Sequence, residues 1–74
     1  LRTPGHVHGL TSLMFETREG IVVVAGDAIL TFEHFDNREP SENAEDPREA
    51  RRSIDRIAKM ADIIVPGHDN YFVV

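Results

Sequence analysis

Two apolar runs near the start of the chain predict a pair of β-strands. The runs Leu10 to Glu16 and Ile21 to Ala25 are rich in Leu, Phe, Ile and Val, and the charged segment between them ends in Gly20. Such a segment is typical of a hairpin connection, so we expect the two strands to pair antiparallel. The second run has no polar alternation, which predicts a strand covered on both faces, as in a layered α/β structure.

A helix is predicted to begin after Asp46 and to run to about Met60. Asp46 can cap the first turn, Pro47 suits the first helical position, and Glu49 lies at the capping-box spacing. Apolar residues recur on one face of this segment and basic residues occupy most of the rest. We expect the apolar face to pack on a sheet and the basic face to be solvated rather than to bind phosphate.

Residues 31–45 follow neither a helical nor a strand period and are crowded with Asn, Asp, Glu, Ser and Pro. They predict a long loop, lying over the end of the second strand as a wall or lid. Phe32 and Phe35 either line a pocket there or anchor the loop to the core. The apolar residues 71–74 at the end of the chain are expected to pack or to pair.

Three potential metal ligands stand beside glycines at the ends of these elements: His6, Asp27 and His68. An antiparallel hairpin puts the start of its first strand beside the end of its second, so His6 and Asp27 share one sheet edge. A third apolar run, Ile63 to Val65, follows the helix, and such a connection is almost always parallel, which brings His68 to the same edge. Two imidazoles and a carboxylate are ligands that zinc and similar ions accept.

Length and composition narrow the possible functions. A chain of 74 residues buries only about 60% of its unfolded surface, so its stability alone is expected to be marginal. The absence of cysteine excludes disulfides, thiolate ligands and a cysteine nucleophile. A net charge of -5 argues against nucleic acid as a partner. No long apolar stretch or signal region is present, which predicts a cytoplasmic protein without a membrane partner.

The three glycine-marked motifs, in this order and with these strands and this helix between them, resemble the C-terminal half of a metallo-β-lactamase-fold hydrolase. That superfamily includes β-lactamases, glyoxalase II, lactonases and some nucleases. The resemblance implies an α/β fold: half of an αββα sandwich made of a β-hairpin, a long loop, a helix and a strand. Residues 1–74 would form the C-terminal portion of one domain. The family's His-x-His-x-Asp-His motif is absent from the sequence.

The resemblance also implies roles for the three ligands. His6 resembles the third histidine of the first metal position, Asp27 the carboxylate that bridges two metals, and His68 the last ligand of the second metal. The complete domain would hold two zinc ions, or iron or manganese, and use activated water against an ester, lactone, thioester or similar bond of a small-molecule substrate. Asp27 would be the catalytic residue of the set.

A second group of candidates has weaker signals, and each member also has a plainer interpretation. His8 could touch substrate or be a surface histidine, and His34 could approach substrate or be solvated. Tyr71 could donate a hydrogen bond near the site or pack against Phe72. Asp69 could orient an imidazole from outside the ligand set or cap the final turn.

The missing motif leaves alternatives open. The N-terminal half is expected in the same parent protein or as a separate chain, since the sequence opens directly on Leu1 and the ligand turn and ends on apolar residues. The 74-residue chain alone is expected to be inactive. It could instead be a truncated, non-catalytic module, or part of a nuclease of the same fold, which would need basic surface elsewhere.

Overall fold

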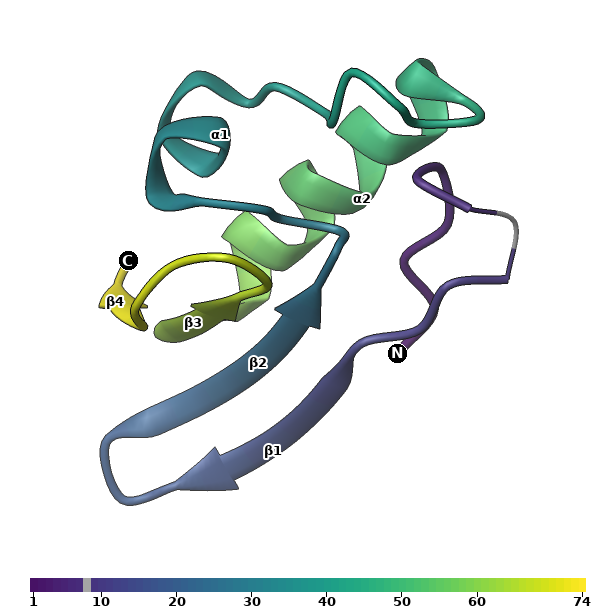
Figure 1. Ribbon diagram of the computed structural model, residues 1–74. Helices are drawn as coiled ribbons and strands as arrows, with labels where there is room; N and C mark the ends of the chain where they lie inside the picture. The colour runs from purple at the N-terminus through teal and green to yellow at the C-terminus, as the bar shows by residue number, and fades with distance from the viewer. Residues whose placement is uncertain (8) are drawn as a thin grey trace.

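The computed structural model describes residues 1–7 and 9–74, which form one sheet with two helices packed on one of its faces (Figure 1). This arrangement confirms the predicted α/β class. In chain order the elements are β1 (Leu13–Thr17), β2 (Gly20–Gly26), α1 (Phe32–Asn37), α2 (Pro47–Met60), β3 (Ile63–Pro66) and β4 (Phe72–Val73).

The four strands lie in the order β1-β2-β3-β4. The predicted hairpin is confirmed: β1 and β2 pair antiparallel, from Leu13 opposite Val24 to Thr17 opposite Gly20. The predicted crossover is confirmed as well, because β2 and β3 are parallel. The apolar C-terminus pairs as expected, with β4 antiparallel to β3.

Helix α2 begins and ends where its sequence signals predict. The Asp46 side chain accepts a hydrogen bond from the Glu49 backbone N–H at 3.2 Å, and Pro47 occupies the first turn. Its apolar residues Ile54 and Ile57 are completely buried against Val23 and other residues of the sheet. Among the described residues no helix is long and apolar enough to cross a membrane.

The prediction that residues 31–45 form a loop throughout is wrong, because α1 lies within it. Thr31 caps this helix by accepting a hydrogen bond from the His34 backbone N–H, and Arg38 ends it in a left-handed conformation at φ 56°. Phe35 is buried in the core, and its ring centroid lies 5.1 Å from the ring centroid of Phe72. Phe35 therefore anchors the segment, whereas Phe32 stays half exposed beside the same ring.

The sheet face turned away from the helices is apolar and uncovered. Cross-strand neighbours share a face, and the pairing registers place one set of apolar residues on this side: Leu13, Phe15, Val22, Val24, Ile63, Val65 and Val73. Leu13 and Val73 are 69% and 71% exposed. Within residues 1–7 and 9–74 no helix or strand packs on these seven residues, here called the open sheet face (Figure 1). Among the described residues no second layer therefore covers β2 on this side, in contrast to the prediction, although Val22, on the inner strand β2, is only 9% exposed.

Candidate metal centre

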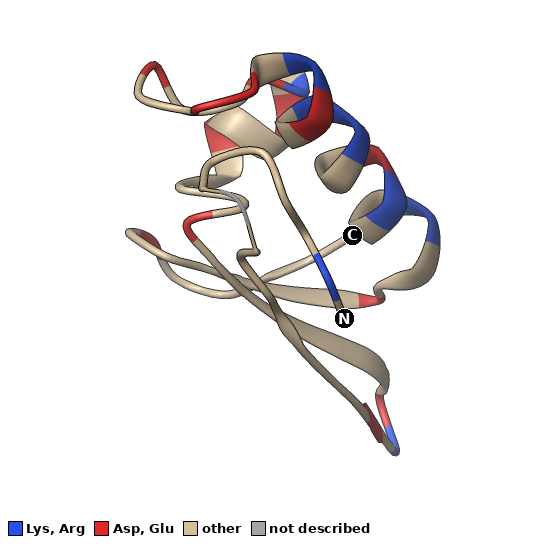
Figure 2. Cartoon of the chain, turned by 90° about the vertical axis from the view of Figure 1, so that its right-hand side faces the viewer, with Lys and Arg blue, Asp and Glu red and all other residues tan. Residues whose placement is uncertain are grey.

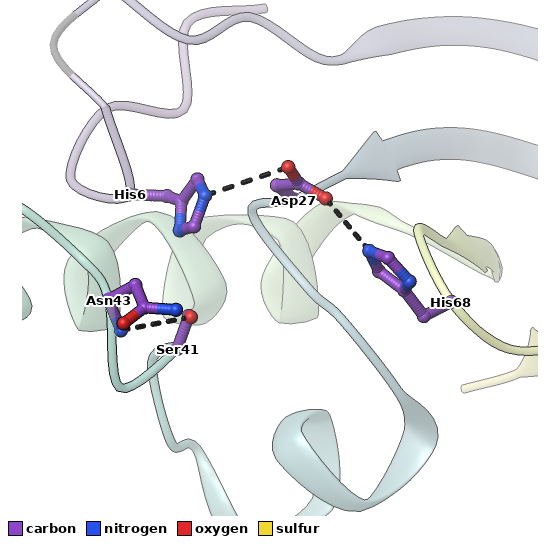
Figure 3. Close-up of polar contacts among 5 residues, drawn as sticks. All are labelled: His6, Asp27, Ser41, Asn43 and His68. Carbon is purple, nitrogen blue, oxygen red and sulfur yellow. Dashed lines mark hydrogen bonds and ion pairs between the residues drawn. The ribbon is translucent and has the colours of Figure 1, made fainter.

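Three side chains that come from distant parts of the sequence meet at one edge of the sheet (Figure 3). The Asp27 carboxylate lies between two imidazoles: its Oδ2 is 3.6 Å from Nε2 of His6, and its Oδ1 is 3.4 Å from Nε2 of His68. The convergence predicted from the topology is therefore observed. Each histidine faces a different oxygen of the same carboxylate.

The His6 turn is held against the start of α2 by backbone contacts. Gly5 has a φ of 126°, and a Cβ atom at this position would clash with the Ala50 backbone, so the turn depends on glycine. The carbonyl of Gly5 accepts from the Asp46 N–H at 2.8 Å, and the carbonyl of His6 accepts from the Glu45 N–H at 3.0 Å. His6 is consequently held by the residues that cap and begin α2.

The His68 loop is held against the segment after β2. The backbone N–H groups of Gly67 and His68 donate to the carbonyls of Ile29 and Leu30, at 3.0 and 2.8 Å. A Cβ atom on Gly67 would lie 2.8 Å from the Gly26 carbonyl oxygen and 3.1 Å from Asp27 Oδ1. The absence of a side chain at Gly67 thus allows the loop to approach the carboxylate.

Solvent access differs across the three side chains. The His6 side chain is 19% exposed, that of Asp27 is 47% exposed, and that of His68 is 68% exposed. His6 Nδ1 is buried and has no hydrogen-bond partner within residues 1–7 and 9–74. A histidine that binds a metal through one ring nitrogen usually donates a hydrogen bond from the other, so this nitrogen lacks the support that such a ligand normally has.

The donor set fits a divalent ion in type and direction but is incomplete. Both nitrogen–oxygen distances exceed the usual hydrogen-bond range of about 2.7–3.2 Å. The imidazole nitrogens and the carboxylate oxygens are therefore not hydrogen-bonded to each other. The carboxylate and the imidazoles form two pairs, His6 with Asp27 Oδ2 and His68 with Asp27 Oδ1, here called the two half-sites. The half-sites share the Asp27 carboxylate. Within residues 1–7 and 9–74, however, no three His, Asp or Glu side chains form a group that could hold a single ion. Each half-site needs further ligands.

The weaker candidates lie in different surroundings. His34 is in α1, where its Nδ1 is 2.8 Å from the Thr31 hydroxyl, and Tyr71 is largely exposed rather than packed. His8 lies outside the described residues. These substrate-binding assignments stay predictions.

The Asp69 carboxylate contacts backbone groups and not an imidazole. Its Oδ2 accepts from the Phe32 N–H at 3.2 Å and its Oδ1 from the Asn70 N–H at 2.9 Å. These two hydrogen bonds, led by that from Phe32, lower the pKa of Asp69. Asp69 therefore ties the His68 loop to the first residue of α1.

Two supporting residues escaped the sequence analysis. Thr31 begins α1 and contacts His34, and a threonine three residues before a histidine on a short helix is a capping pattern that could have been noticed. Ser53 is buried on α2 and donates to the Pro4 carbonyl at 2.7 Å, which supports the His6 turn. A lone serine on an apolar helix face was the only signal for this contact.

Comparisons with known proteins identify the family of the chain. The family model of the metallo-beta-lactamase superfamily matches residues 1–68. A metallo-beta-lactamase domain-containing protein 1 from Xenopus laevis is 41% identical over 97% of the chain, and the protein of that name from Mus musculus is 39% identical over 97%. The chain spans about 30% and 28% of the lengths of these relatives.

Solved structures give the same result. An N-acyl homoserine lactone hydrolase, with the product N-hexanoyl-L-homoserine bound at its catalytic metal centre, superposes with a TM-score of 0.76 at 39% identity. A quorum-quenching N-acyl homoserine lactone lactonase superposes with a TM-score of 0.76 at 32% identity. The matches cover 93% and 97% of this chain but only 29% and 36% of those proteins. The chain thus matches about a third of the length of each of these proteins.

Proposed function

The chain belongs to the metallo-β-lactamase superfamily, and we propose that it is the C-terminal portion of a metal-dependent hydrolase domain. The observation that carries this proposal is the Asp27 carboxylate held between His6 Nε2 and His68 Nε2, at 3.6 and 3.4 Å. Ligands from three separate segments meet there, although no local sequence constraint requires them to.

In the complete domain His6 would bind one ion, His68 a second, and Asp27 both. The proposed ions are zinc, with iron or manganese as alternatives, since a nitrogen and oxygen ligand set serves all three. Bound ions would generate hydroxide from water near neutral pH and polarise the bond under attack. The chain's own contribution is to place the two imidazoles on either side of the carboxylate, through the two backbone hydrogen bonds that dock the His68 loop and the glycine turn that docks His6.

The remaining ligands would come from the N-terminal half of the domain, which would also cover the open sheet face. Two observations support the proposal that an N-terminal half packs on this chain. The half-sites lack ligands among the described residues. The seven residues of the open sheet face include side chains that are about 70% exposed. A second layer packed on that face would correct both deficits, because it would end at the same sheet edge as Asp27.

The substrate is proposed to be a small molecule with an ester, lactone, thioester or similar bond. Support comes from the similar solved structures, which are lactone-hydrolysing enzymes. His34 and Tyr71 are proposed as substrate contacts only in the complete domain, because α1 and the loop after His68 lie beside the metal edge.

The test is metal binding by the complete domain, with Asp27→Ala compared with Asp36→Ala. Asp36 is an exposed carboxylate on α1 and serves as the matched control. We expect about two equivalents of zinc in the parent domain and in Asp36→Ala, and a large loss of both zinc and lactone hydrolysis in Asp27→Ala. Zinc content and hydrolysis that are unchanged in Asp27→Ala would instead favour the non-catalytic module.

A further inference from the structure

A hollow separate from the metal edge lies between the turn at Pro4 and helix α2. Its volume is about 370 Å³, and it is lined by Pro4, Glu49, Arg52, Ser53 and Arg56. His6, Asp27 and His68 do not line it. The hollow is therefore a feature that the proposed hydrolase function does not use.

The surface around this hollow is basic, although the whole chain is acidic. Helix α2 carries five of the eight basic residues, and after Pro47 every exposed residue of the helix is basic. Figure 2 shows these residues in blue along the outer side of the helix. Asp55, an acidic residue of the same helix, has its Oδ1 3.6 Å from Arg38 Nε, which offsets its charge. The exposed side of α2 is therefore locally positive, although the chain as a whole has a net charge of -5.

The walls of the hollow are held in place by hydrogen bonds. Ser53 is only 2% exposed, and its hydroxyl donates to the Pro4 carbonyl at 2.7 Å. An Arg56 guanidinium nitrogen donates to the Arg2 carbonyl at 3.2 Å, which holds this side chain over the turn. Arg52 lies one helical turn before Arg56, about 6 Å along the axis. Two arginine residues thus border a concave surface that includes the buried, hydrogen-bonded Ser53.

We propose that this hollow binds a phosphate group through Arg52 and Arg56. Guanidinium groups form paired hydrogen bonds to phosphate oxygens, and Arg is preferred over Lys where that geometry matters. The exposed face of α2 has no aromatic or large aliphatic side chain, whereas protein partners and membranes are usually bound through such residues. The Glu49 carboxylate at the border opposes an anion and limits the affinity.

The phosphate could belong to a small molecule or to a nucleic acid strand, and the two sources make different demands. A small phosphate compound needs only the hollow. A strand would also use the other exposed cations of α2, so its affinity would fall steeply with salt concentration. The acidic remainder of the chain would weaken a strand more than a small anion.

The test is a titration of the complete domain with sodium phosphate, followed by NMR of the backbone amides and the arginine Nε–H groups. Sodium chloride at equal ionic strength is the control. We expect saturable shifts at Arg52, Ser53 and Arg56 with phosphate only. Arg52→Gln should weaken binding about threefold to fivefold, as expected for one exposed ionic contact, and Glu49→Gln should strengthen it.

Arg51→Gln is the matched control, because Arg51 is exposed on the same helix but does not line the hollow. Equal weakening by Arg51→Gln and Arg52→Gln, or equal shifts with chloride, would overturn the proposal. A parallel titration with a short oligouridylate identifies the source: tighter, strongly salt-dependent binding supports a nucleic acid strand, and affinity like that of free phosphate supports a small molecule. Either result is independent of metal at the other site.

Discussion

The two faces of the sheet differ in how much of their apolar surface the chain buries. On the helix side Val23, Ile54 and Ile64 are completely buried. On the open sheet face the cross-strand rows are equally apolar, yet Leu13 and Val73 remain about 70% exposed. Burial of apolar surface is the main stabilising contribution in folding. The chain therefore forms one half of a core and offers the other half for association.

The metal edge repeats this contrast between its two histidines. His6 is mostly buried and lies in a turn docked on α2, whereas His68 is two-thirds exposed on a loop that is held by backbone hydrogen bonds and by the Asp69 side chain. One half-site is thus enclosed by the chain itself, and the other is open. The open half-site is where further protein would have to supply both ligands and cover.

The largest expected effect tests the difference between the two faces directly. Ile54→Ala removes a fully buried side chain from the helix side and should lower the free energy of unfolding by about 4 kcal/mol. Leu13→Ala, on the open sheet face, should lower it by no more than about 0.5 kcal/mol. Urea denaturation at several protein concentrations measures both. Comparable losses would mean that the open face is already covered, for example by a second copy of the chain.

The next effect concerns the docking of His6 on α2. Gly5→Ala introduces a Cβ that clashes with the Ala50 backbone at a φ of 126°, and we expect a loss of about 3 kcal/mol in unfolding free energy. Gly9→Ala is the control, because Gly9 also has a positive φ but has no atom within 4 Å of the added Cβ. Its cost should be only the backbone strain, about 1–2 kcal/mol. Thermal unfolding of the two variants shows whether close packing or strain dominates.

Much of the fold was predictable because its signals are local. The hairpin follows from two apolar runs and a glycine-ended connection, and α2 follows from Asp46, Pro47 and Glu49. The meeting of His6, Asp27 and His68 was also predictable, since the strand directions bring their three segments to one sheet edge.

The features that sequence reasoning missed depend on distant contacts. Helix α1 has only six residues, too few to show a period, and it is held by the packing of Phe35 on Phe72, far along the chain. The first strand begins at Leu13 and not at Leu10, because Thr11 pairs instead with Arg2 in an isolated bridge. The position of Asp69 on the Phe32 backbone is likewise set by the fold.

A smaller effect is expected at the open half-site. Gly67→Ala places a Cβ 2.8 Å from the Gly26 carbonyl oxygen, so the His68 loop should move away from Asp27 at a cost of about 1 kcal/mol in stability. The histidine ring signals of His68 should shift in NMR spectra, while those of His6 stay unchanged. Asn70→Ala, an exposed change in the same loop, should move neither. A shift of the His6 signals in Gly67→Ala would show that the two half-sites are coupled through Asp27.

The smallest effect is expected where the His68 loop meets α1. Asp69→Ala removes the acceptor for the Phe32 and Asn70 N–H groups, so the Phe32 amide should exchange its hydrogen with solvent faster. Asp69→Asn keeps one carbonyl acceptor and should have an intermediate effect. Helix α2 has its own cap at Asp46, so its amides serve as the internal control in the same measurement. If hydrogen exchange in α1 were unchanged by Asp69→Ala, the packing of Phe35 and the Thr31 cap would be sufficient to hold this helix. The His68 loop would then not stabilise it.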